Sequence, residues 1–203
     1  MIVTYHGGAM IKVQQGERVV VFNPLGRDSG LKPVRFGADL ALVSVSLPLA
    51  NGVEEVTFGD RRPFVVDGPG EYEVAETFIR GFSSSGPEQK INTIYDLIID
   101  GKRLVHLGML ADKELTLAVK EELTPVDILF VGLDQAALPP RLAYQLALSL
   151  NPHLIIPVNY SPATLASFLK EAGEDAVQPL DKLTIKGREL LEKEAEVVVL
   201  KAD

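Results

Sequence analysis

The hydrophobic periodicity of the chain changes near residue 112, and this change restricts the folds that are open to it. Before that point, short runs rich in β-branched and aromatic residues are separated by Gly, Pro, Asn and Asp, a pattern typical of strands and turns. The expected strands are IVTYH, MIKVQ, RVVVF, LALVSV, PFVVDG, TFIRGF, TIYDLIID and RLVHLG. After it, we expect helices at 113–123, 140–150 and 162–172, and strands at 127–131, 154–158 and 196–200.

This order of elements predicts an α/β fold. Alternating strands and helices imply right-handed crossovers and parallel pairing. Asp100-Gly101 supplies the tight turn of an antiparallel hairpin in the first half. Because buried strands need helices to cover them, we expect a four-layered α/β/β/α sandwich, with two β-sheets face to face and helices outside. The segment 82–90, which contains Ser-Ser-Ser-Gly-Pro, is the expected mobile loop.

Composition narrows the class of protein. A chain of 203 residues that is 46% hydrophobic can bury one substantial core, so we expect a single domain over residues 1–203. The formal charge of −8, with no cluster of Lys and Arg, argues against nucleic acid and anionic membranes as partners. The chain has no cysteine, which excludes disulfides, thiolate metal ligands and cysteine nucleophiles. No basic leader and no apolar run of about 20 residues is present, so we expect a soluble cytoplasmic protein.

The segment LVSVSLPLANG, residues 42–52, has the outline of an active-site loop without reactive side chains. It leaves a strand, turns at a proline and ends in Asn-Gly, as loops at the C-terminal ends of strands often do. Where reactive groups are expected, it places Val45, Leu47, Leu49 and Ala50.

Motifs spread over nearly the whole chain resemble the metallo-β-lactamase fold. They are, in chain order, Tyr5-His6-Gly7-Gly8, Phe22-Asn23-Pro24, Phe36-Gly37-Ala38-Asp39 before LALVS, Asp67-Gly68-Pro69-Gly70-Glu71-Tyr72-Glu73-Val74, Asn92-Thr93-Ile94-Tyr95, Val105-His106-Leu107-Gly108 and Asn151-Pro152 before IIPVNY. More narrowly, the sequence is similar to the branch of small metal-dependent hydrolases related to the L-ascorbate-6-phosphate lactonase.

The sequence differs from that family at the positions of the metal ligands. The family's loop carries His-x-His-x-Asp-His, because two adjacent divalent metals need imidazole and carboxylate donors from one short turn. Laid on this chain, the four donors correspond to Val45, Leu47, Leu49 and Ala50. The resemblance also implies a bridging aspartate where Met109 stands and a histidine where Asn159 stands, in Pro-Val-Asn-Tyr. A further family histidine is expected near 81–85, and none is found there. We therefore expect no bound metal, no other cofactor and no catalytic residue.

Other polar residues could rebuild a site, and each also has a structural interpretation. His6 lies at a strand end in a glycine-rich turn, and His153 in a helix-to-strand connection where we expect exposure. His106 matches a histidine that the family keeps beside its site. Glu71 and Glu73 share one face of a strand, so they are either a carboxylate pair for acid–base work or solvated side chains.

Two classes of function follow. The first is a metal-free, non-catalytic descendant of a metal hydrolase, with a structural, ligand-binding or interaction role, because fold does not imply function. The alternative is a metal-dependent hydrolase of a small substrate that uses a residual pocket formed by Asp67, Glu71 and His106. The partner is an unknown small molecule or protein, and a homo-oligomer is one of the options.

The apolar loop itself has two expected placements. Either it packs inward against Met109 and the neighbourhood of Asn159 and closes the former site, or it forms an exposed patch that a second copy covers. We expect closure, because in an extended segment Val45, Leu47 and Leu49 would share one face.

Overall fold

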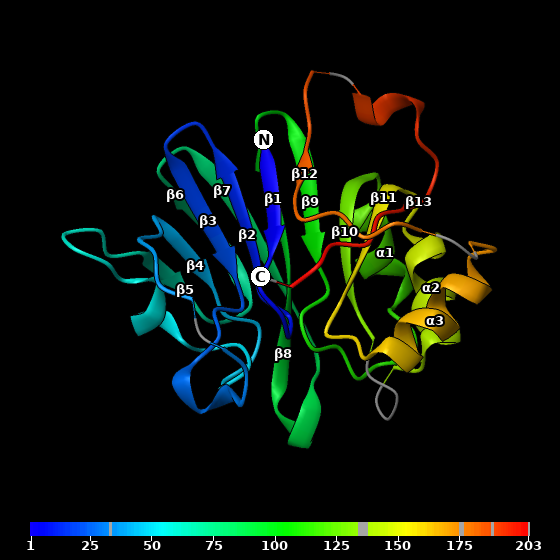
Figure 1. Ribbon diagram of the computed structural model, residues 1–203, viewed down its shortest axis with the longest axis horizontal. Helices are drawn as coiled ribbons and strands as arrows, with labels where there is room; N and C mark the ends of the chain where they lie inside the picture. The colour runs from blue at the N-terminus through cyan, green and yellow to red at the C-terminus, as the bar shows by residue number, and fades with distance from the viewer. Residues whose placement is uncertain (33, 134–137, 175–176, 188, 203) are drawn as a thin grey trace.

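The computed structural model describes residues 1–203 except 33, 134–137, 175–176, 188 and 203. The described residues form two mixed sheets (Figure 1). The first has the order β12-β1-β2-β3-β4-β5, with β12 (Leu183–Thr184), β1 (Ile2–Tyr5), β2 (Ile11–Gln15), β3 (Arg18–Phe22), β4 (Leu40–Leu42) and β5 (Phe64–Val66). The second has the order β13-β11-β10-β9-β8-β7-β6, with β13 (Glu196–Val197), β11 (Pro152–Val158), β10 (Val126–Gly132), β9 (Lys102–His106), β8 (Ile91–Ile99), β7 (Thr77–Ser85) and β6 (Gly70–Val74).

The main core lies between the two sheets. Alternate side chains of the strands point into it, among them Val3, Val20 and Leu42 from the first sheet and Leu97 and Phe130 from the second, all at most 1% exposed. This alternation is what the β-type runs in the sequence predict. The face-to-face arrangement of the expected sandwich is confirmed.

The outer layers differ between the two sheets. The helices α1 (Leu117–Leu123), α2 (Pro140–Ser149) and α3 (Pro162–Glu171) pack on the second sheet over a separate apolar cluster (Figure 1). The outer side of the first sheet is covered by the β3–β4 connection and by short 3-10 helices, η1 (Arg27–Ser29) and η2 (Val53–Val56). Among the described residues, no helix has the length and apolarity to cross a lipid bilayer.

Strand pairing follows the sequence-based expectations closely. Strands β8 and β9 form the expected hairpin, with Asp100 and Gly101 both at positive φ, 53° and 69°. Strands β9, β10, β11 and β13 pair in parallel, as the alternation of strands and helices predicts.

Three expected boundaries were wrong. The segment 82–90 is not a free loop, because Phe82–Ser85 continue β7 and pair with β8 before the short 3-10 helix η3 (Pro87–Gln89), so ladder hydrogen bonds override the Ser-rich composition. Helix α1 begins at Leu117 instead of residue 113, since the hydroxyl of Thr116 caps it. The last strand ends at Val197, while Leu200 forms only an isolated bridge with Leu180.

Candidate functional site

The apolar loop begins at Leu42, the last residue of β4, and folds back on itself. The backbone nitrogen of Leu47 donates to the carbonyl of Val45, and the backbone nitrogen of Ala50 donates to the carbonyl of Leu47, each at 2.9 Å. The loop is therefore turned and not extended. The burial nevertheless alternates: Val45 and Ala50 are 2% and 0% exposed, Leu47 and Leu49 are half-buried, and the intervening Ser46 and Pro48 are exposed.

The buried side chains of this loop form a small apolar cluster, which we call the apolar plug. Its members are Ala9, Val45, Leu47, Leu49, Ala50 and Met109. Five of these six residues are the positions where the resemblance places metal donors. The expected inward packing against Met109 within one chain is confirmed.

Asn159 lies beside the plug. Its backbone nitrogen donates to the carbonyl of Gly8 at 2.6 Å, next to Ala9 of the plug, and a Cβ placed on Gly8 would lie 3.7 Å from a methyl group of Leu49. All six sequence-predicted former site positions therefore lie in one region, at the ends of β4, β9 and β11.

The residues in this region do not fit a metal centre. Among the described residues, no group of three or more His, Cys, Asp or Glu side chains is arranged to hold an ion. Hydrocarbon and thioether side chains fill the plug, where the sequence resemblance places the family's donors, and divalent hydrolase metals need nitrogen and oxygen donors.

His106 is a structural residue of the core. It is 0% exposed and stacks against the rings of Phe22 and Phe130, with centroid distances of 5.1 and 5.5 Å. Its Nδ1 accepts from the nitrogen of Gly108 at 2.9 Å, which leaves Nε2 as the donor to the carbonyl of Ala9 at 3.0 Å. Burial lowers the pKa of His106 to about 3, so the ring is neutral near pH 7.

The expected residual pocket is not assembled. His106 is engaged by backbone groups on both ring nitrogens, while Asp67 lies exposed after β5. Glu71 and Glu73 project from β6 to the solvated side, whereas Tyr72 and Val74 are half-buried, so the interpretation as solvated side chains is confirmed.

The other two histidines also have structural surroundings. His6 is 8% exposed and packs near the ring of Phe36, 5.7 Å between centroids. The expected exposure of His153 was wrong: the residue lies within β11, half-buried, with Nδ1 2.7 Å from the carbonyl of Lys193. It is held there because strand β11 begins at Pro152, two residues earlier than the periodicity indicates.

A buried polar cluster behind the plug was missed by sequence reasoning. The Asn92 Oδ1 accepts from the nitrogen of Met109 at 2.8 Å, and the Asn23 Oδ1 accepts from the nitrogen of Ser44 at 2.8 Å. Among the described residues, neither the Asn23 Nδ2 nor the Ser44 Oγ has a hydrogen-bond partner. A Cβ on Gly108 would lie 2.3 Å from the Asn92 Oδ1 and 2.7 Å from the Ser44 Oγ. The motifs Phe-Asn-Pro, Asn-Thr-Ile-Tyr and His-Leu-Gly were the sequence signals for this cluster.

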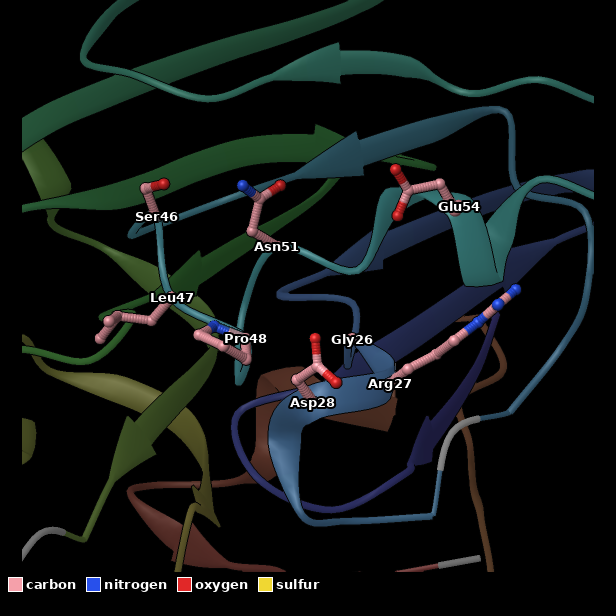
Figure 2. A pocket seen from close by; sticks show the side chains of 8 residues that line it. All are labelled: Gly26, Arg27, Asp28, Ser46, Leu47, Pro48, Asn51 and Glu54. Carbon is pink, nitrogen blue, oxygen red and sulfur yellow. The ribbon is translucent and has the colours of Figure 1, made fainter.

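Two cavities flank the loop. The larger, of about 450 Å³, lies between η1 and the residues from Ser46 to Glu54, and Leu47 of the plug forms part of its lining (Figure 2). Asp28 points into this space from below in Figure 2, opposite Asn51 and Glu54, while Arg27 extends to one side. Arg27 is bound to Glu55, whose pKa it lowers through a hydrogen bond. The second cavity, of about 330 Å³, lies on the other side of the loop between Ser44 and Asp67.

Substituting single metal donors into the plug is expected to destabilise the protein without creating a metal site. Leu47→His or Leu49→Asp should each lower the free energy of unfolding by about 1–3 kcal/mol, because a polar group replaces apolar packing. Chemical denaturation measures the loss, and equilibrium dialysis measures bound zinc. Ser46→His is the matched control, since Ser46 is exposed and its replacement should cost less than about 0.5 kcal/mol. Tight zinc binding by either single variant would show that more of the site survives than the geometry indicates.

Comparison with known proteins identifies relatives of this chain. A family model described as a beta-lactamase superfamily domain matches residues 2–159. A proposed Zn-dependent hydrolase of the metallo-beta-lactamase superfamily from Thermotoga maritima is 25% identical, with a TM-score of 0.80 over 98% of this chain and 97% of that chain. The metallo-beta-lactamase fold protein YhfI from Bacillus subtilis has a TM-score of 0.63 at 11% identity, covering 99% and 97% of the two chains. No curated protein matches the sequence.

Proposed function

Since the chain belongs to the beta-lactamase superfamily, we propose that it is a metal-independent, non-catalytic member that acts by binding a small molecule or another protein. One observation carries this proposal. The five positions where the family places donors from the loop and from the segment after β9 are apolar, and they pack together as the plug.

The energetics of the plug support the loss of metal. A histidine or aspartate buried there without a metal would be a poorly solvated polar group, at a cost of about 1–3 kcal/mol. A fully buried Val or Leu instead stabilises the fold by roughly 1.5–3 kcal/mol. Because all the donors are replaced, the remaining neighbours of the site cannot compensate as they could for one lost ligand.

The alternative function, hydrolysis at a residual site, has less support from the geometry. The structure of the Thermotoga maritima relative is that of a proposed Zn-dependent hydrolase, which favours this class by analogy. In this chain, however, His106 is neutral and buried, and both its ring nitrogens are bonded to backbone groups, whereas Asp67 and Glu71 are exposed. A general base needs to reach a substrate proton, and this ring has no free nitrogen to do so.

We expect the purified protein to contain far less than one equivalent of zinc, manganese or iron. Elemental analysis of a preparation made without an affinity tag measures this directly. A chelator should leave the melting temperature unchanged, because a metal that binds the native state would contribute to folding energy. Stoichiometric metal together with a chelator-dependent melt would overturn the proposal and favour the hydrolase.

The closer link to the L-ascorbate-6-phosphate lactonase branch remains a prediction from the motifs. The cytoplasmic location, the single-domain organisation and the homo-oligomer also remain predictions. Size-exclusion chromatography with light scattering would decide the oligomeric state.

A further inference from the structure

The cavity on the second side of the loop has a lining that sequence reasoning did not anticipate. It lies between the end of β4, the end of β5 and the start of β8, and its volume is about 330 Å³. The backbone carbonyl of Ser44 accepts from the nitrogen of Thr93 at 2.8 Å, which ties the two sheets together at this rim. The lining residues used below are Ser44, Val45, Asp67, Pro69, Lys90 and Ile91.

The charges at this cavity are opposite and not paired with each other. Lys90 and Asp67 are both exposed, and the Lys90 Nζ donates only to the carbonyl of Ser46, at 3.2 Å, among the described residues. Neither side chain takes part in an ion pair with another described residue. The Lys90 ammonium and the Asp67 carboxylate therefore border the same cavity without forming an ion pair. This arrangement is complementary to a ligand that carries one negative and one positive charge.

The buried hydroxyl of Ser44 adds a second observation. Ser44 is 2% exposed, and its Oγ has no hydrogen-bond partner among the residues that the structure describes. A buried hydroxyl without a partner is unfavourable. The Ser44 Oγ faces Gly108 in the free protein, and rotation about the Cα–Cβ bond would turn it toward the cavity that Ser44 lines, where it would donate to a ligand carboxylate. Val45, Pro69 and Ile91 supply apolar surface beside these polar groups, and Ile91 is 64% exposed.

We infer that this cavity binds a small zwitterion of the α-amino-acid type with a short aliphatic side chain. Lys90 and Ser44 hold the carboxylate, Asp67 holds the ammonium group, and the apolar residues contact the aliphatic substituent. The inference names a ligand class for the binding role proposed above. It does not depend on the metal content, because the groups that bind the charges, on Ser44, Asp67 and Lys90, are not members of the plug.

Titration of the purified full chain tests the inference, with L-valine as the probe and isothermal calorimetry and amide chemical shifts as the readouts. Valine should bind saturably, with shift changes at the lining residues. Isovalerate, which lacks the ammonium group, and isobutylamine, which lacks the carboxylate, should each bind at least about tenfold more weakly, because each loses one charged contact.

Variants assign the contacts to residues. Lys90→Gln and Asp67→Asn should each weaken valine binding at least about tenfold, and the exposed controls Lys182→Gln and Asp60→Asn should leave it unchanged. Ser44→Ala should weaken binding while the free protein melts at the same or a higher temperature, since the lost hydroxyl has no partner.

Three results would overturn the inference. The first is no binding of valine or of glycine to the wild-type chain, and the second is equal binding of valine and isovalerate, which would indicate a simple anion site. The third is valine binding that survives both charge variants. None of these results would affect the metal analysis, so a failure here is distinguishable from a failure of the proposed function.

Discussion

Gly52→Ala is expected to lower the free energy of unfolding by about 4 kcal/mol or more, or to prevent folding. A Cβ at this position would lie 2.2 Å from the carbonyl oxygen of Leu25 and 2.3 Å from the nitrogen of Gly26. These are backbone atoms that no side-chain rotation can move away, and overpacking of this kind is among the few causes of very large destabilisation.

The backbone at Gly52 approaches Leu25 and Gly26 closely because two backbone hydrogen bonds hold these segments together. The nitrogen of Gly52 donates to the carbonyl of Pro24 at 2.7 Å, and the nitrogen of Gly26 donates to the carbonyl of Pro48 at 2.8 Å. These two bonds fasten the β3–β4 connection to the apolar loop, so a Cβ at position 52 would separate two segments that border the plug.

Urea and thermal denaturation measure the effect of Gly52→Ala. Gly68→Ala is the matched control, because a Cβ there meets nothing within 4 Å and the residue is not in the left-handed region. It should unfold within about 1 kcal/mol of the wild type. If Gly52→Ala is as stable as Gly68→Ala, the prediction is wrong, and the β3–β4 connection and the apolar loop can move apart at little cost.

The second large effect is loss of stability in mild acid through His106. Burial lowers the pKa of this ring from 6.5 to about 3 in the folded chain. As the pH falls below 6.5, the unfolded chain takes up a proton that the native chain excludes. The stability from this neutral ring is therefore complete above pH 6.5 and is lost progressively toward pH 3, at about 1.4 kcal/mol per pH unit and on the order of 5 kcal/mol in all.

Denaturation curves between pH 6.5 and 4.5 isolate this contribution, because most carboxylates titrate below that window. His106→Gln should be less stable near pH 7, by about 2 kcal/mol or more, since it loses the ring packing against Phe22 and Phe130. Its stability should nevertheless fall less steeply with pH than that of the wild type. The control His153→Gln leaves His106 intact and should show the same change of unfolding free energy with pH as the wild type. If His106→Gln also shows this unchanged pH dependence, His106 is not its source.

The sequence alone determined the order of the elements and much of the pairing. Periodicity and turn residues act over a few positions, so the runs around Val20 and Leu97 identify strands, and Asp100-Gly101 identifies a hairpin, without reference to the rest of the chain. The apolar character of the loop at Val45, Leu47, Leu49 and Ala50 was also visible, because it depends only on residue identity.

The boundaries and the outer layers depended on longer-range contacts. Ser83, Ser84 and Ser85 have a loop-like composition, yet they form the end of β7 because β8 provides hydrogen-bond partners. Likewise, no local signal shows that the first sheet is covered by 3-10 helices and a long connection instead of α-helices.

The tertiary structure alone decided which side chains meet at the candidate site. The Ser44 carbonyl reaches the nitrogen of Thr93, and the His106 Nε2 reaches the carbonyl of Ala9, across separations of 49 and 97 residues. Such contacts arise from the facing of two sheets, which closes the plug, engages the Nε2 of His106 and forms the cavity that Asp67 and Lys90 line. Local patterns carry no information on these contacts, because loop closure and sheet packing fix them only when the whole chain has folded.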